Sequence, residues 1–213
     1  MKKFTTILFI LLFSIFFSNV NKAQFNLGAF FGYGMSAFEN FTDNAGYIPM
    51  GLQAYYSFDK LSFGSLNFGV EFNYSVVPFT FEAKANTGEK FYDWKIKQMI
   101  IAALIKVKFL KASINPFVRL GAGLYTGGST LEWTDIGRQA AQQQGINPVE
   151  EIKFDSAFGF NVGAGADYKF GKMYGVFLEF LYHIVSRKPE NAQESGGANN
   201  WAVQAGFQVA FGK

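Results

Sequence analysis

Seven charged residues lie within segments that otherwise alternate between apolar side chains and small or polar ones. Each stands on the small or polar side, so it shares a face with the residues two positions away. Opposite charges that meet in an interior form ion pairs, or they line a narrow path for ions. The seven are Glu71, Lys106, Lys108, Arg119, Asp167, Lys169 and Glu179.

His183 is the only histidine, and Ser186, Glu190 and Glu194 follow it. Serine, histidine and a carboxylate are the parts of a hydrolase triad, in which histidine takes the proton of the hydroxyl. A metal site would need further ligands, and the chain has no second histidine and no cysteine. Alternation places His183 on the polar, inward side of its segment, away from lipid. We therefore expect no catalytic, metal-binding or cofactor-binding residues in this chain.

Two glycine pairs, Gly121 with Gly123 and Gly163 with Gly165, could suggest a phosphate-binding loop. Such a loop leads into a helix N-terminus, whereas these glycines lie inside alternating segments. Small side chains on a crowded inner face explain them better.

The alternation has a period of two residues, which is the period of a β-strand. It is clear at 201–211, where Trp201, Val203, Phe207 and Phe211 share one row and small or polar residues fill the other. Seven further segments show it: 25–35, 47–58, 66–76, 94–109, 115–125, 156–170 and 174–184.

The register of segment 94–109 needs a separate argument, because residues 99–105 are apolar on both faces. A lysine that faces lipid costs about 2–4 kcal/mol near the middle of the bilayer. We therefore place Gln98, Lys106 and Lys108 inward, and Ile101 and Ile105 outward.

The connections alternate in length. Residues 59–64, 110–113 and 171–173 are short, whereas 36–46, 78–93, 127–155 and 186–200 are longer. This is the layout of an outer-membrane barrel with short periplasmic turns. Lipid offers no partner to a free strand edge, so segment 201–211 must pair with 25–35. The sequence predicts an all-β, eight-stranded antiparallel up-and-down transmembrane β-barrel.

Residues 1–23 read as a cleaved signal peptide, with Lys2 and Lys3 before the apolar run 7–17. The barrel domain is then 24–213. Removal of Lys2, Lys3 and Lys22 leaves 16 of the 19 basic residues against 16 acidic ones. This zero balance argues against nucleic acid as a partner. The absence of cysteine excludes disulfides and a lipoprotein anchor.

Outward aromatic residues gather near the two ends of the predicted strands, where membrane-interface girdles should lie. On the short-turn side they are Phe58, Phe109, Tyr168, Phe170, Tyr174 and Phe211. On the long-loop side they are Tyr33, Tyr74, Phe158, Tyr182 and Trp201.

The interior of an eight-stranded barrel is only wide enough for side chains to fill. We therefore expect the seven inward charges to form a network of ion pairs that plugs the lumen; a narrow ion path is the alternative. Large inward groups such as Phe30, Tyr55 and Phe177 argue against a wide pore.

The third long loop contains a predicted helix, 135–144, which Gly145 and Pro148 end. Its faces are mostly polar, so we expect a solvated loop helix. Ligand or partner contacts should lie in the long loops, where a barrel carries most of its variable chemistry.

Three stretches resemble the outer-membrane β-barrel-domain family, which is related to OmpA/OmpX-type small barrels. They are FGFNVGAGADYKF at 158–170, NPFVRLGAG at 115–123 and the final strand 201–211. A PorT-like subset of the family is also similar. The resemblance implies the outer membrane of a Gram-negative cell, outer-membrane lipid and lipopolysaccharide as surroundings, and recognition by the barrel-assembly machinery. That recognition uses the C-terminal strand, and here Gly212 and Lys213 follow its last aromatic residue, Phe211.

The leading functional hypothesis is a non-enzymatic outer-membrane barrel with a structural, adhesion or surface-interaction role. The PorT-like resemblance implies an alternative, an accessory of a secretion system. A lipid A hydrolase is a further alternative, although small barrels that deacylate lipid A use a His-x-Ser spacing and His183 and Ser186 are one residue further apart. A soluble lipocalin-like carrier would need the reverse orientation, with apolar rows inside.

Overall fold

The computed structural model describes residues 23–38, 45–58, 64–79, 89–187 and 196–212. Residues 1–22 of the predicted signal peptide lie outside these described residues. Glu190 and Glu194 lie outside them as well. The strands are β1 (Ala23–Phe38), β2 (Ala45–Phe58), β3 (Ser65–Phe79), β4 (Tyr92–Lys108), β5 (Ile114–Trp133), β6 (Glu151–Phe170), β7 (Tyr174–Arg187) and β8 (Gly196–Phe211).

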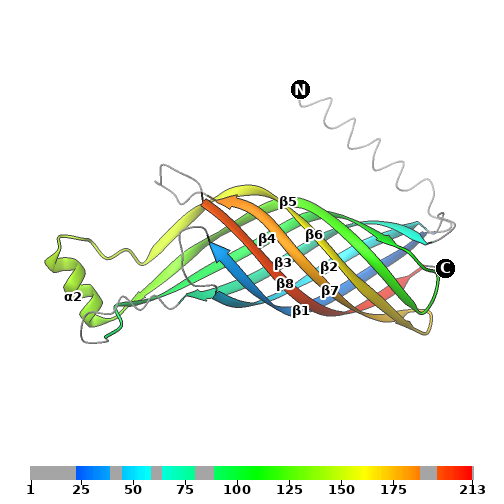
Figure 1. Cartoon of the computed structure of the whole chain (residues 1–213), viewed down its shortest axis with the longest axis horizontal. Coiled ribbons are helices and arrows are strands. Elements are labelled where there is room, and N and C mark those ends of the chain that lie inside the picture. Colours follow the sequence, from blue (N-terminus) through cyan, green and yellow to red (C-terminus); the bar gives the residue numbers. More distant parts are fainter. Residues whose placement is uncertain (1–22, 39–44, 59–63, 80–88, 188–195, 213) are drawn as a thin grey trace, which may run out of the picture.

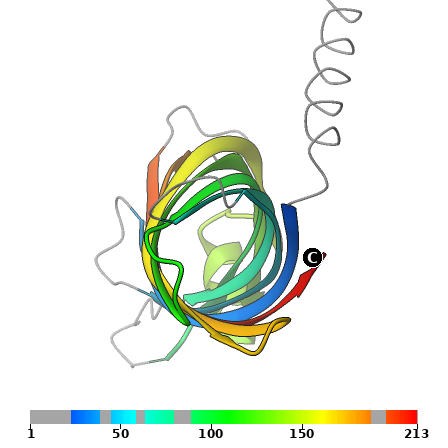
Figure 2. The same cartoon turned by 90° about the vertical axis from the view of Figure 1, so that its right-hand side faces the viewer.

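Each strand pairs antiparallel with the next, and β8 returns to β1 to close the barrel. The closing register joins Phe25 to Phe211 and continues to Phe38 opposite Ala198. Figure 1 shows the tilted strands from the side, and Figure 2 shows the ring they form in end view. The predicted eight-stranded antiparallel barrel is confirmed.

Burial follows the predicted alternation around the wall. Apolar residues such as Phe31, Leu52 and Leu120 are exposed on the outside, and even the least exposed of these three, Leu120, is 60% accessible. Polar residues on the other rows are buried inside. In β4, Lys106 and Lys108 face inward while Ile101 and Ile105 face outward, so the predicted register of this strand is also confirmed.

Most strands are longer than the sequence predicts: β8, for example, begins at Gly196 rather than at 201, and the largest change is in the loop between β5 and β6. β5 continues to Trp133 and β6 begins at Glu151, whereas the alternation indicated a loop over 127–155. A register shift between Tyr125 and Gly127 lets the two strands keep pairing, up to Thr130 opposite Glu151. This is the effect of a β-bulge, which breaks the alternation and hides the strand from a pattern search.

The predicted loop helix is present as α2 (Asp135–Gln143), with Gln144 as its C-cap rather than its last residue. Thr134 caps its N-terminus, since its Oγ1 accepts a hydrogen bond of 3.1 Å from the Gly137 amide. No helix among the described residues is long and apolar enough to cross a membrane.

Inward glycines and inward aromatic rings pack together across neighbouring strands. A Cβ at any of these glycines would lie within 2.8 Å of a ring atom. The lumen therefore holds large rings only because their neighbours have no side chain. The pairs are Gly34 with Tyr47, Gly51 with Phe30, Gly69 with Tyr55, Gly159 with Tyr125, Gly165 with Phe117, and Gly206 with Phe177.

The substitution Gly69→Val should impair folding, because a Cβ there would lie 2.5 Å from Tyr55 Cδ1. We expect a loss of about 1–3 kcal/mol in unfolding free energy, typical of overpacking. Urea unfolding in detergent micelles measures it. Val70→Leu, on the outward neighbour, is the control and should change little; equal effects of the two substitutions would contradict this packing account.

Candidate functional site

The middle of the lumen holds an ion-pair cluster centred on Arg119 of β5. Its Nη1 donates to Glu71 Oε2 on β3 at 2.8 Å and to Glu179 Oε1 on β7 at 3.0 Å. Its Nη2 donates to Asn161 Oδ1 on β6 at 3.2 Å. All four side chains are almost fully buried. A single guanidinium thus joins four strands across the interior.

Glycine positions create the room for this cluster. Gly163 pairs with Arg119 in the β5–β6 register, and a Cβ there would lie 3.2 Å from Arg119 Cγ and 2.6 Å from Leu181 Cδ2. Gly121 lies beside Asn161, whose Oδ1 would be 2.5 Å from a Cβ. The glycines that the sequence placed on a crowded inner face do have crowded surroundings.

A second cluster surrounds Asp167 of β6. Lys108 Nζ lies 2.5 Å from Asp167 Oδ2, and Lys106 Nζ lies 4.0 Å from Oδ1. The Lys106 ammonium also lies over three rings, at 4.0 Å from the centroid of Phe117, 4.5 Å from Tyr55 and 5.3 Å from Phe177. Because ring faces attract cations, these contacts hold the ammonium at the centre of the lumen.

The two clusters carry complementary charge. One has a single cation and two carboxylates, and the other has two cations and one carboxylate. Lys106 and Arg119 are direct neighbours in the β4–β5 register, which brings the clusters together. Of the seven charges predicted to share the lumen, these ion pairs join six. The seventh, Lys169, is half-buried near the short β6–β7 turn, opposite Gly175.

His183 has a structural environment. Its Nδ1 lies 3.0 Å from the Tyr125 hydroxyl, which also donates to the Phe160 carbonyl at 3.2 Å. His183 is buried on the lumen side of β7, whereas Ser186 is exposed on the other face. The structure therefore does not bring these two residues together. Among the described residues, no group of three or more histidine, cysteine or acidic side chains could hold a metal ion.

Apolar side chains fill the lumen on the long-loop side of the ion pairs. Tyr47, Ile96 and Ala202 form a buried cluster, against which Trp94 and Phe154 pack. Phe154 enters this cluster because the bulge in the β5–β6 pairing reverses the faces of β6. We did not predict this plug, since residues 127–155 were expected to form a loop.

Beyond the barrel, β4, β5 and β6 continue as a three-stranded projection that carries α2 at its end (Figure 1). Tyr92 and Trp133 face each other with ring centroids 4.8 Å apart. Thr134 Oγ1 donates to the Lys90 carbonyl at 2.8 Å, and Trp133 Nε1 donates to the Val149 carbonyl at 2.9 Å. These contacts fix the helix and the segment after it to the strands.

Charged and apolar groups cover this projection. Lys95 pairs with Glu132 at 2.6 Å, and Arg138 of α2 pairs with Glu150 at 2.8 Å. Three large aliphatic side chains remain exposed there: Ile136, Ile146 and Val149. The projection is thus an ordered surface with both apolar and charged groups at the long-loop end.

The predicted girdle residues all lie on the outer wall, exposed or half-exposed. On the short-turn side, Phe170 stacks on Tyr174 with centroids 6.3 Å apart, and Tyr168 lies 6.3 Å from Phe170. On the long-loop side, Trp201 stacks on Phe180 at 6.1 Å.

A closed antiparallel barrel with an apolar outer wall, aromatic ends and a polar interior is the architecture of outer-membrane β-barrels. The chain belongs to the Outer membrane protein beta-barrel domain family, whose profile matches residues 5–211. It is therefore an outer-membrane β-barrel protein. No curated protein matches the sequence.

Several solved structures are similar to this chain at low sequence identity. Neisserial surface protein A is 16% identical, with a TM-score of 0.57 and coverage of 88% of this chain and 97% of that one. OprG from Pseudomonas aeruginosa is 13% identical, with a TM-score of 0.48 and coverage of 91% and 98%. Ail, the attachment invasion locus protein of Yersinia pestis, is 14% identical, with a TM-score of 0.44 and coverage of 87% and 98%.

Replacing Arg119 by Met should destabilise the barrel strongly, because it leaves Glu71 and Glu179 buried without their cation. We expect a loss of about 3–5 kcal/mol in unfolding free energy. Adding Glu71→Gln and Glu179→Gln should recover part of it. Arg138→Met, which breaks the exposed pair with Glu150, is the control and should cost less than about 1 kcal/mol in the same urea titration.

Proposed function

We propose that this protein is a non-enzymatic outer-membrane barrel that acts through its surface projection, in adhesion or another surface interaction. The observation that carries the proposal is the ordered extension of β4, β5 and β6 with α2 beyond the barrel. This extension is not required for strands to cross the membrane. The tight contacts of Thr134 and Trp133 hold a defined shape, which recognition of a partner requires.

The filled lumen supports a role outside the barrel rather than transport through it. Ion pairs and aromatic rings occupy its centre, and the apolar cluster of Tyr47, Ile96 and Phe154 occupies the long-loop side. The placement of His183 and Ser186 on opposite faces of β7 gives no support to a lipid A hydrolase.

In the proposed setting, outer-membrane lipid and lipopolysaccharide surround the wall, and the barrel-assembly machinery recognises β8. A PorT-like accessory role in a secretion system is a second candidate, based on the resemblance of the sequence. It would use the same projection. Crosslinking of intact cells before purification distinguishes the adhesion role from the secretion-accessory role. Only the accessory role predicts that residues in α2 are crosslinked to other outer-membrane proteins.

Replacing residues 131–150 by a two-residue Asn-Gly turn should abolish surface interaction without unfolding the barrel, because Thr130 of β5 and Glu151 of β6 are paired and the turn can join them directly. The measurement is adherence of a Gram-negative host that displays the protein, to epithelial cells and to itself. Heat-modifiable migration on gels controls for folding. Equal adherence of the folded variant and the parent would overturn the proposal.

Planar bilayers that contain the purified protein should show no porin-sized conductance, since the lumen is filled at two levels. A 16-stranded porin in the same bilayer is the positive control. Steady large-channel currents from the parent protein would contradict a plugged lumen.

A further inference from the structure

The short-turn end of the barrel presents basic side chains and no exposed acidic ones among its described residues. Lys111 lies in the β4–β5 turn and Lys172 in the β6–β7 turn, and both are exposed. Lys169, near the end of β6, is half-buried. The acidic side chain nearest this end is Asp167, which is buried and paired with two lysines of the lumen. The described surface of this end is therefore positively charged.

The long-loop end has a different charge balance. Residues 89–97 and 128–155, which form most of the projection, include five basic and seven acidic residues. Ion pairs join three of the basic residues to acidic neighbours. The third short connection, 59–64, lies mostly outside the described residues, and its sequence has one acidic and one basic residue, Asp59 and Lys60. The positive charge is thus specific to the short-turn end.

Hydrogen bonds between elements fix the backbone around these lysines. The Lys169 amide donates to the Ser113 carbonyl at 2.8 Å, which joins the end of β6 to the β4–β5 turn. The Ala210 amide donates to the Met173 carbonyl at 2.7 Å, which joins the β6–β7 turn to the end of β8. The lysines therefore extend from defined positions at the rim of the barrel.

Exposed apolar side chains stand next to the lysines in both turns. Leu110 precedes Lys111, and Met173 follows Lys172. Girdle residues adjoin the same turns: Phe109, Phe170 and Tyr174. In a membrane, apolar and aromatic side chains lie at the boundary of the hydrocarbon, and a lysine stem extends along them until its ammonium reaches the polar headgroups. The sequence of each turn therefore places an ammonium at the depth of the lipid phosphates.

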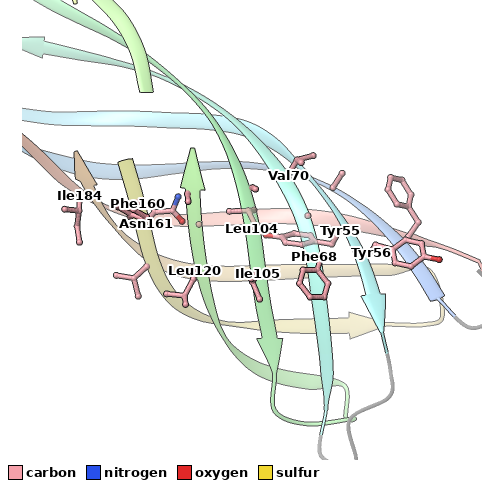
Figure 3. A pocket seen from close by; sticks show the side chains of 17 residues that line it. Tyr55, Tyr56, Phe68, Val70, Leu104, Ile105, Leu120, Phe160, Asn161 and Ile184 are labelled. Carbon is pink, nitrogen blue, oxygen red and sulfur yellow. The ribbon is translucent and has the colours of Figure 1, made fainter. Parts of the chain in front are cut away.

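The wall between the two ends has no group that distinguishes one headgroup from another. A hollow around Phe68, Ile105 and Leu120 is lined by no charged residue (Figure 3). Such a surface contacts acyl chains whatever headgroup they carry. A preference for one class of phospholipid has to come from the charged rim.

Short turns are periplasmic in outer-membrane barrels, so this rim faces the phospholipid leaflet. We propose that Lys111, Lys169 and Lys172 form a binding surface for the phosphates of anionic phospholipids, of the phosphatidylglycerol type, in that leaflet. Each lysine near an anionic membrane surface adds to the attraction, whereas a zwitterionic headgroup has no net charge to attract it. The surface lies at the opposite end of the barrel from the projection, so it does not rest on the adhesion role.

The test compares phosphatidylglycerol with phosphatidylethanolamine of the same acyl chains. The full mature chain, folded in nonionic detergent, is titrated with each lipid, and native mass spectrometry counts the lipids bound. Phosphatidylglycerol should bind at least about fivefold more tightly, the factor that one lysine contributes. The preference should fall when ammonium acetate is raised from about 50 mM to about 500 mM, because salt screens charge. Equal affinities at low salt would overturn the proposal.

Lysine variants locate the binding surface. Lys111→Gln with Lys172→Gln should lower the affinity for phosphatidylglycerol by about fivefold for each lysine removed and leave that for phosphatidylethanolamine unchanged. Lys97→Gln with Lys153→Gln is the matched control, because it removes two exposed lysines at the long-loop end. It should change neither affinity. Equal losses from the two double variants, or no loss from the first, would contradict a site at the short-turn rim.

Only protein with the heat-modifiable migration of a folded barrel is scored, so misfolding cannot imitate loss of the site. Soluble peptidoglycan fragments, which carry carboxylates, are titrated in parallel. Tighter binding of these fragments than of phosphatidylglycerol would overturn the proposal. So would full displacement of the lipid by an equal concentration of inorganic phosphate, since the site would then bind the free anion rather than a lipid.

Discussion

Hydrocarbon cannot hydrogen-bond to the backbone, and the rest of this structure depends on that constraint. Every N–H and C=O at membrane depth needs a partner within the protein, so a β-sheet there must close on itself. The pairing of β1 with β8 over Phe25–Phe211 to Phe38–Ala198 satisfies this requirement. Closure then forces alternate side chains either into lipid or into a narrow interior.

The interior has to be filled within that limit. Large rings fit because glycines face them on neighbouring strands, as Gly69 faces Tyr55. Charged side chains can be buried there because they form ion pairs: Arg119 pairs with two carboxylates, and Asp167 pairs with two lysines. The six charges sum to zero. An isolated charge in this space would be costly, so each cluster depends on the other being nearby.

Above the membrane, water satisfies the backbone and the requirement for closure ends. In this region β4, β5 and β6 extend beyond the barrel, and the β5–β6 register shifts. The helix α2 follows β5 there. The bulge also turns Phe154 into the mouth of the lumen. The change from hydrocarbon to water around the backbone thus explains why the wall is regular and the projection is irregular.

The sequence by itself determined the strands, their inward and outward faces and the closed barrel, because a period of two residues is a local property of the chain. Even the ambiguous β4 was assigned correctly, since lysines at positions 106 and 108 cannot face lipid at low cost. Only the tertiary structure decided which carboxylates Arg119 meets, because Glu71 and Glu179 lie on strands that do not adjoin β5. It also decided the inward turn of Phe154. That turn depends on register between strands, and register is a relation between distant segments that no local pattern contains.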